Sequence, residues 1–277
     1  MPLGTLDTAT GLIYQATGPE DAPVAVYLPG VHGDWTPNLA ARPFLTRDIR
    51  LIEVAYPRVQ DWELANFADS LVELLDSLGV GCAHLIAESF GSLVGWKMGL
   101  TRPERVQSLL LVGGFTQPPA FGLATSAKWG LWCLPTTILE KGIDAYVLYK
   151  SGKGEQRLGR DQDVAPYPAV RTPLGKLATA NRMAIIERTD VRGQLHRITH
   201  PVRYLGGETD FVIPIRRELE TLKRHLPEHC KFESHLIEGG PHAVIASHPK
   251  RTAETLARWV SEIDLSRKAS SEHRGDS

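Results

Sequence analysis

The sequence has few cysteines, no long apolar run and no recognisable leader. Its three cysteines, Cys82, Cys133 and Cys230, are odd in number and far apart, which argues against a disulfide framework or a cysteine zinc site. No stretch reaches the ~18 consecutive apolar residues that a membrane-spanning helix requires. The first residues lack the basic segment and apolar run of a secretory signal. We therefore expect a cytoplasmic protein without a membrane span.

A strong net charge is also missing. The 31 Lys and Arg residues are matched by 32 Asp and Glu, and the net charge at pH 7 is −1. Nucleic-acid binding requires a strongly positive face, so we expect no nucleic-acid partner. The 42% hydrophobic and 23% charged residues are typical of a globular protein, which argues against disorder as the main state.

Cofactor and metal motifs are absent as well. Gly79-Val80-Gly81 precedes an apolar run instead of following one, which is the wrong order for a dinucleotide-binding loop, and no Gly-Lys-Ser/Thr phosphate loop occurs. His196 and His200 are four residues apart but have no evident third ligand, and a proline interrupts the similar pair His225 and His229. We therefore expect neither a metal nor a cofactor.

From Pro23 onward, short apolar runs alternate with segments of helical periodicity. This order is typical of strands and crossover helices, and runs without polar alternation indicate strands that are covered on both faces. The sequence therefore predicts an α/β fold with a mostly parallel sheet flanked by helices. The expected strands are 24–28, 50–54, 83–87, 106–112, 201–205 and 232–237, and the expected helices are 61–78, 92–100 and segments after Pro214 and Pro249.

Residues 116–200 do not follow this alternation. They separate two expected strands by far more chain than one crossover helix needs, and they contain several helix-like apolar clusters. We predict a helical cap over 116–200, inserted into a core formed by 1–115 and 201–265. A basic, glycine-rich run at 150–160 is expected to be a solvated connection, with a loop near an anionic ligand as the alternative. The polar residues 266–277 are expected to form a disordered tail.

One expected strand-to-helix junction has the pattern of a nucleophile elbow. In Ala87-Glu88-Ser89-Phe90-Gly91, a small residue stands two positions before the serine and another two positions after it. Small residues there allow the strand and the helix to approach while the serine adopts a strained backbone conformation. The bend places the hydroxyl at the carboxyl edge of the sheet and at the amino end of the next helix, where the helix dipole favours negative charge.

Two later segments extend this pattern into a resemblance to the α/β-hydrolase family. The turn Gly-Gly-Glu-Thr-Asp that ends at Asp210 resembles that family's acid-bearing turn, and Gly-Gly-Pro-His, ending at His242, resembles its histidine loop. The order Ser89, Asp210, His242 is the family's chain order of nucleophile, acid and base. The resemblance covers roughly residues 20–263, although the predicted cap matches in position only.

The same residue types suit serine catalysis on chemical grounds. A serine hydroxyl is a poor nucleophile until a neighbouring imidazole takes its proton, which is the role expected of His242. Asp210 would accept a hydrogen bond from the other ring nitrogen and stabilise the imidazolium. The alternatives are a turn-forming aspartate and an ordinary loop histidine, and the combination of all three residues favours the catalytic interpretation.

A developing oxyanion requires backbone N–H donors. One is expected from Phe90, directly after the nucleophile. The second is expected from Val31, because Leu-Pro-Gly-Val resembles the family's His-Gly-x turn with proline in place of histidine. A different register, with His32-Gly33 as the His-Gly pair, makes Asp34 the second donor.

Tryptophans are candidates for the substrate pocket. We predict substrate contacts for Trp35, beside the expected oxyanion turn, and for Trp129 and Trp132 in the predicted cap, with core packing as the alternative.

The combined pattern predicts a carboxylesterase-like serine hydrolase that cleaves a small-molecule ester through an acyl-enzyme intermediate. Serine at the elbow argues against dehalogenase and epoxide-hydrolase chemistry, for which the resemblance implies aspartate. A carbon–carbon hydrolase, a thioesterase and a non-catalytic ligand receptor remain alternatives, and the oligomeric state stays open.

Overall fold

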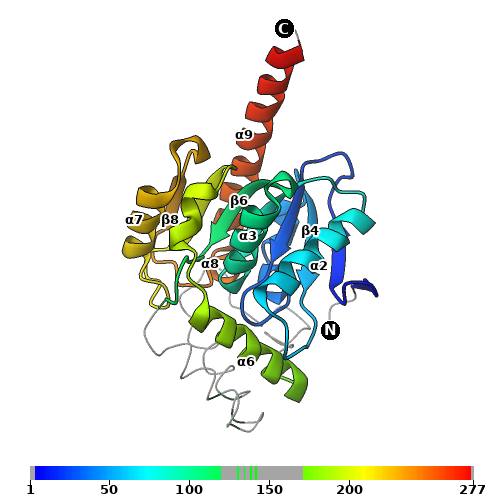
Figure 1. The fold of residues 1–277 in the computed structure, drawn as a ribbon, viewed down its shortest axis with the longest axis vertical. Helices are drawn as coiled ribbons and strands as arrows, with labels where there is room; N and C mark the ends of the chain where they lie inside the picture. The colour runs from blue at the N-terminus through cyan, green and yellow to red at the C-terminus, as the bar shows by residue number, and fades with distance from the viewer. Residues whose placement is uncertain are drawn as a thin grey trace.

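An eight-stranded sheet is the centre of the computed structural model, which describes residues 4–119 and 171–275 and the single positions 130, 134, 138 and 141 (Figure 1). The strand order is β1-β2-β4-β3-β5-β6-β7-β8. β1 and β2 run antiparallel at one edge, and every pair from β4 to β8 is parallel. The predicted α/β fold with a mostly parallel sheet is therefore confirmed. The strands are β1 (Thr5–Leu6), β2 (Ile13–Thr17), β3 (Val24–Leu28), β4 (Arg50–Ala55), β5 (Ala83–Glu88), β6 (Val106–Val112), β7 (Val202–Gly207) and β8 (Glu233–Ile237).

Helices cover both faces of this sheet (Figure 1). One face packs against α2 and α3 and the other against α1, α8 and α9. The α-helices of the described ranges are α1 (Arg42–Leu45), α2 (Leu64–Ser77), α3 (Phe90–Thr101), α6 (Pro173–Arg188), α7 (Ile215–His225), α8 (Val244–Ser247) and α9 (Pro249–Gly275). Short 3-10 helices are η1 (Thr36–Asn38), η2 (Pro103–Arg105), η3 (Arg192–Arg197) and η4 (Glu228–Cys230).

The central strands are apolar on both faces because each face meets helices. In β5, Leu85 and Ala87 pack in the cluster that contains α2 and α3, whereas Ile86 packs in the cluster that contains α9. Successive side chains of a strand point to opposite faces, so a strand between two helical layers is apolar at nearly every position. This arrangement explains why the sequence shows continuous apolar runs at the central strands.

Two parts of the chain differ from the sequence-based expectation. The edge strands β1 and β2 were not expected, because β2 is mixed in polarity and only partly buried. Residues 266–275, expected to belong to a disordered tail, continue α9, which projects beyond the sheet in Figure 1. A helix that the buried Trp259 and Ile263 have already nucleated extends at low cost through polar residues that include no proline.

The predicted cap is described only in part. Within 116–200 the structure describes α6 and η3, and most of residues 120–170 lie outside the described residues. The boundaries of the cap therefore stay a prediction. None of the helices in the described ranges combines the length and the apolar character needed to cross a bilayer.

Candidate active site

Ser89 occupies a sharp bend between β5 and α3. Its φ of 49° and ψ of −114° lie outside the regions that most residues adopt. Gly91 makes the bend possible, because a Cβ at this position would lie 2.3 Å from the carbonyl oxygen of Leu28 in β3. Helix and strand therefore approach each other more closely than any side chain at position 91 would permit.

Hydrogen bonds hold the strained residue on both sides. The Ser89 amide donates to the carbonyl of Val112 at 3.0 Å, and the Ser92 hydroxyl donates to the carbonyl of Ser89 at 2.6 Å. The Ser92 hydroxyl also accepts from the amide of Phe115 at 3.1 Å. A strained conformation costs about 1–3 kcal/mol and persists only where its surroundings hold it in place, as they do here.

The structure brings Ser89, His242 and Asp210 together in one hydrogen-bonded chain. His242 Nε2 lies 3.0 Å from Ser89 Oγ, and His242 Nδ1 lies 2.7 Å from Asp210 Oδ2. The histidine side chain is 15% exposed and the aspartate side chain is fully buried. We call these residues the candidate triad.

The acid and histidine loops hold each other in place. Asp210 Oδ1 accepts hydrogen bonds from the amides of Val212 at 2.8 Å and Ile213 at 3.0 Å, which directs Oδ2 toward His242. The Thr209 amide donates to the carbonyl of Gly240 at 2.9 Å and so ties the loop after β7 to the loop after β8.

The turn after β3 lies beside the candidate nucleophile. A Cβ at Gly30 would lie 3.4 Å from Ser89 Cβ. The carbonyl of Gly30 accepts a hydrogen bond from the Gly33 amide at 3.0 Å. Because the N–H and C=O of a trans peptide point in opposite directions, the Val31 N–H points away from Gly33. A Cβ at Gly33, in contrast, would lie 2.7 Å from Nη2 of Arg182 in α6.

Asp34, the alternative donor, has a local structural role. Its Oδ1 accepts a hydrogen bond from the Thr36 amide at 2.9 Å at the start of η1. Its carbonyl accepts a hydrogen bond from His32 Nε2 at 2.8 Å. These contacts fix the end of the turn, and they engage the side chain and the carbonyl of Asp34 within the turn itself.

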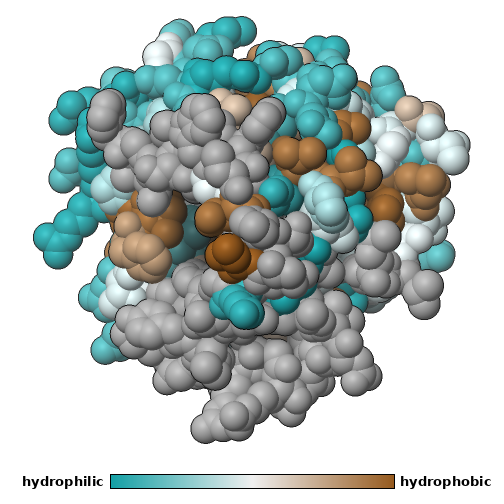
Figure 2. Space-filling view, turned by 90° about the horizontal axis from the view of Figure 1, so that it is seen from below, coloured by the Kyte–Doolittle hydropathy of each residue, from teal (hydrophilic) through white to brown (hydrophobic). Residues whose placement is uncertain are grey.

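Of the three tryptophans predicted to contact substrate, the structure describes Trp35 alone. Trp35 is fully buried and packs in the core cluster on the α9 face of the sheet, which favours the core-packing alternative. Trp129 and Trp132 lie outside the described residues. Phe211, directly after Asp210 and not among the predicted site residues, is a large apolar side chain with 67% exposure. Figure 2 shows the α6 end of the molecule, where apolar residues lie among hydrophilic ones.

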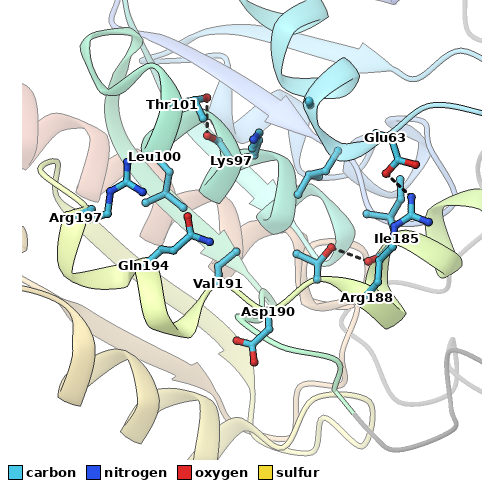
Figure 3. A pocket seen from close by; sticks show the side chains of 13 residues that line it. Glu63, Lys97, Leu100, Thr101, Ile185, Arg188, Asp190, Val191, Gln194 and Arg197 are labelled. Carbon is cyan, nitrogen blue, oxygen red and sulfur yellow. Dashed lines mark hydrogen bonds and ion pairs between the residues drawn. The ribbon is translucent and has the colours of Figure 1, made fainter.

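A groove of about 440 Å³ runs between α2, α3, α6 and η3 (Figure 3). Its lining residues include Lys97, Gln194 and Arg197 but none of the candidate triad. An ion pair between Arg188 of α6 and Glu63, just before α2, crosses its rim. The groove is therefore separate from the candidate triad. In the described ranges, no three His, Cys, Asp or Glu side chains are grouped to hold a metal ion.

Comparison with known sequences identifies relatives of similar length. A family model for the alpha/beta hydrolase fold matches residues 38–134. A protein of Pseudomonas savastanoi pv. phaseolicola named "Putative carbamate hydrolase RutD" is 28% identical over 263 residues, which cover 87% of this chain and 94% of that protein. A protein of the same name from Caulobacter vibrioides is 26% identical, with 94% and 98% of the two chains covered.

Solved structures share the fold at low sequence identity. A hydrolase from Pseudomonas aeruginosa PA01 superposes with a TM-score of 0.72 at 20% identity and covers 93% of this chain and 97% of its own. The enol-lactonase from Burkholderia xenovorans LB400 superposes with a TM-score of 0.70 at 15% identity, with 90% and 96% covered. At such identities the likeness concerns the fold alone.

Proposed function

Because this chain has the α/β-hydrolase fold, we propose that it is a serine hydrolase that cleaves a small-molecule carboxylic ester through an acyl-enzyme on Ser89. The proposal rests on one observation: His242 connects the serine to the aspartate. Its Nε2 lies 3.0 Å from Ser89 Oγ and its Nδ1 lies 2.7 Å from Asp210 Oδ2. An ionised carboxylate only accepts hydrogen bonds, so His242 Nδ1 carries the proton and Nε2 is free to accept the proton of the serine. No cofactor is needed for this chemistry.

Acylation uses each member of the candidate triad in turn. Ser89 Oγ attacks the ester carbonyl carbon while its proton moves to His242 Nε2. Asp210 stabilises the resulting imidazolium through Nδ1–H. The tetrahedral intermediate collapses, the bond to the alcohol oxygen breaks, and His242 gives its proton to that oxygen. The products of this half-reaction are the free alcohol and an ester of Ser89.

Deacylation repeats the sequence with water as the nucleophile. His242 removes a proton from water as the water oxygen attacks the acyl carbon, and it returns that proton to Ser89 Oγ when the acyl–serine bond breaks. The carboxylic acid leaves and the enzyme is regenerated.

The oxyanion formed in both steps takes two backbone donors in this proposal. Phe90 N–H is at the first position of α3, where the helix dipole favours negative charge. Val31 N–H is the second donor in this proposal, because a Cβ at Gly30 would lie 3.4 Å from Ser89 Cβ, whereas the three atoms nearest a Cβ at Gly33 all belong to Arg182. The structure thus supports Val31 over the Asp34 register.

Carbamate hydrolysis is a second candidate, and the relatives favour it. Two proteins that match this chain over 87–94% of its length at 26–28% identity both have the name "Putative carbamate hydrolase RutD". The same serine, histidine and oxyanion donors would act on a carbamate carbonyl. Attack by Ser89 would break the bond from the carbamate carbonyl to its leaving oxygen or nitrogen, which His242 would protonate, and would leave a carbamoyl-serine for water to hydrolyse. A carbamate carbonyl is less electrophilic than that of an ester, because both of its heteroatoms donate electron density to it.

A substrate panel separates these activities. Purified protein would be assayed with p-nitrophenyl esters of graded acyl length, with the matched p-nitrophenyl carbamates and with acyl thioesters, and Ser89→Ala would be the blank. The ester proposal expects turnover of at least one ester that exceeds turnover of its carbamate partner. Faster turnover of the carbamates would favour the second candidate. Equal turnover by Ser89→Ala, or none with any member of the panel, would contradict the proposal.

A further inference from the structure

A buried arginine from α6 lies against the turn that carries the proposed oxyanion donor. Arg182 is 2% exposed, its Nε donates to the carbonyl of Val31 at 2.7 Å, and its Nη2 donates to the carbonyl of His32 at 3.4 Å. Nη2 also donates to Thr179 Oγ1 at 3.1 Å, one turn earlier in α6. The guanidinium touches the turn directly, because a Cβ at Gly33 would lie 2.7 Å from Nη2.

These contacts occupy the carbonyls of three successive residues. The Gly30 carbonyl bonds to the Gly33 amide, and the Val31 and His32 carbonyls face Arg182. Each trans peptide directs its N–H opposite to its C=O. Arg182 therefore fixes the directions of the His32 and Gly33 N–H groups, and the Gly33 N–H in turn holds the Gly30 carbonyl, whose peptide carries the Val31 N–H. Gly30, which directly precedes the proposed donor Val31, adjoins Ser89, because a Cβ at Gly30 would lie 3.4 Å from Ser89 Cβ.

We propose that Arg182 is a positioning residue that holds this turn in register with Ser89 and so keeps the Val31 N–H aimed at the oxyanion. The inference rests on the proposed serine hydrolase function. It assigns part of the oxyanion site to α6, which lies in the segment predicted to form the cap, so the packing of α6 on the core completes that site. No sequence pattern pointed to Arg182, since its contacts join residues about 150 positions apart.

The guanidinium remains a cation under ordinary conditions. Burial lowers the pKa of Arg182 to about 10, and this effect is partly opposed by Tyr56 and Asp34. The group is therefore charged at neutral pH, and its bonds to carbonyl oxygens are of the stronger, charge-assisted kind. A neutral side chain of similar size would fill the space without holding either carbonyl.

The other end of α6 offers a matched control. Arg188 lies on the same helix, but it is about half exposed and pairs with Glu63 at the groove of Figure 3. Arg182→Met and Arg188→Met therefore each remove a guanidinium from the same helix, but only the guanidinium of Arg182 contacts the turn. Arg182→Lys keeps a charge at the site but loses the fork that reaches two carbonyls.

The test compares these variants for kcat, KM, thermal unfolding temperature and the inhibition constant of a boronic acid, which mimics the tetrahedral intermediate. For Arg182→Met we expect kcat to fall about 10- to 100-fold, below the ~100- to 1,000-fold typical of removing an oxyanion donor outright. We expect KM to stay within about threefold and boronate affinity to fall in parallel with kcat. Arg182→Lys should recover part of the loss, and Arg188→Met should resemble the wild type.

Three results would overturn the inference. The first is wild-type kcat and boronate affinity in Arg182→Met. The second is an equal loss in Arg188→Met, and the third is a loss that follows only the unfolded fraction at the assay temperature. Labelling by a fluorophosphonate separates the two proposals. A wild type that is not labelled at Ser89 removes the proposed function and this inference together, whereas a labelled wild type with an unimpaired Arg182→Met removes the inference alone.

Discussion

The described part of the chain contains two hydrogen-bonded sets of serine, histidine and aspartate. One is the candidate triad at the carboxyl edge of the sheet. The other, which we call the buried set, consists of Ser108 in β6, His84 in β5 and Asp264 in α9. His84 Nδ1 lies 2.7 Å from Ser108 Oγ and His84 Nε2 lies 3.4 Å from Asp264 Oδ1. The two sets share their residue types, but the ring nitrogens exchange partners and the histidine–aspartate distance is 3.4 Å in the buried set against 2.7 Å in the candidate triad.

The two sets differ in backbone conformation and in access. Ser108 lies within β6 and pairs with His84 of β5, next to a register shift between Ala83 and His84, and both Ser108 and His84 are fully buried. Ser89 lies in a strained bend with a φ of 49° at the amino end of a helix, and its histidine partner is 15% exposed. A nucleophile needs access to a substrate and donors for an oxyanion. Ser89 is partly exposed at the amino end of α3, whereas Ser108 is fully buried within a strand. Residue types alone therefore do not make a catalytic site.

The buried set is suited to a structural role. Burial lowers the pKa of His84 to about 4, although Asp264 opposes this effect, so the imidazole is neutral at physiological pH. A neutral imidazole between Ser108 and Asp264 satisfies buried polar groups and connects the sheet to α9.

The largest expected contrast is between the two serines. Ser89→Ala should lower kcat by about 10⁴- to 10⁶-fold, the range seen when a nucleophilic serine is removed, and the protein should stay folded. Ser108→Ala should leave kcat unchanged but lower the free energy of unfolding by about 1–3 kcal/mol, because it removes the hydrogen-bond partner of a buried imidazole nitrogen. Steady-state kinetics and urea unfolding of both variants check this. Loss of activity in fully folded Ser108→Ala would contradict the contrast.

Replacing the two aspartates should give the same contrast as replacing the two serines, with a smaller loss of kcat. Asp210→Asn should lower kcat by about 10⁴-fold, because an amide in place of the carboxylate favours the wrong tautomer of His242. Asp264→Asn should leave kcat near the wild-type value, since its histidine faces no substrate. Comparable kcat values for the two variants, measured on the best substrate of the panel, would remove the distinction between the sets.

Acid should destabilise the protein through its buried histidines. Burial lowers the pKa of both His84 and His200 to about 4 from an ordinary 6.5. Because folding favours the neutral form of each histidine, the free energy of unfolding is not reduced by either histidine above pH 6.5. It falls as the pH is lowered from 6.5 toward 4, where the unfolded chain binds protons that the folded protein does not. The loss should reach about 3 kcal/mol for each histidine. Urea unfolding between pH 7 and pH 4 measures it.

A matched pair of variants tests the origin of that pH dependence. His200→Asn should flatten the curve, because His200 is buried and neither of its ring nitrogens has a hydrogen-bond partner within the described part of the chain. His235→Asn replaces an exposed histidine of β8 and should leave the curve unchanged. Parallel curves for the wild type and His200→Asn would show that the explanation is wrong.

The smallest expected effect concerns the close approach at the bend. Gly91→Ala should destabilise the protein by about 1–3 kcal/mol, because the new Cβ would meet the Leu28 carbonyl at 2.3 Å. Gly81→Ala is the control, since a Cβ there has no described neighbour within 4 Å. Thermal unfolding of both variants checks the difference, and equal stability would mean that the bend tolerates a side chain at position 91.

The sequence predicted those features that depend on local pattern. Continuous apolar runs located the central strands because each is covered on both faces. Small residues around Ser89 predicted the bend, because steric crowding there depends on only a few neighbouring positions. The partners Asp210 and His242 were predicted from turns that resemble the acid turn and histidine loop of the α/β-hydrolase family, together with that family's chain order.

Other features depend on packing between distant segments and left no local signal. Arg182 meets Val31 only because α6 packs on the turn after β3. Trp35 follows that turn in sequence, yet it packs with α9 on the face of the sheet opposite to α2 and α3. Its position beside the turn in the sequence therefore did not indicate where its side chain packs. The edge strand β2 and the end of α9 are mixed or polar in sequence, and their structure depends on pairing and on helix extension.

The central claim is that Ser89, and not Ser108, is an activated nucleophile. The direct measurement is to treat the folded protein with a fluorophosphonate and to locate the adduct by peptide mass spectrometry. The account predicts one adduct per chain, on Ser89, with none on Ser108 and none in the Ser89→Ala variant. An unmodified Ser89 after complete reaction, or an adduct on Ser108, would contradict it.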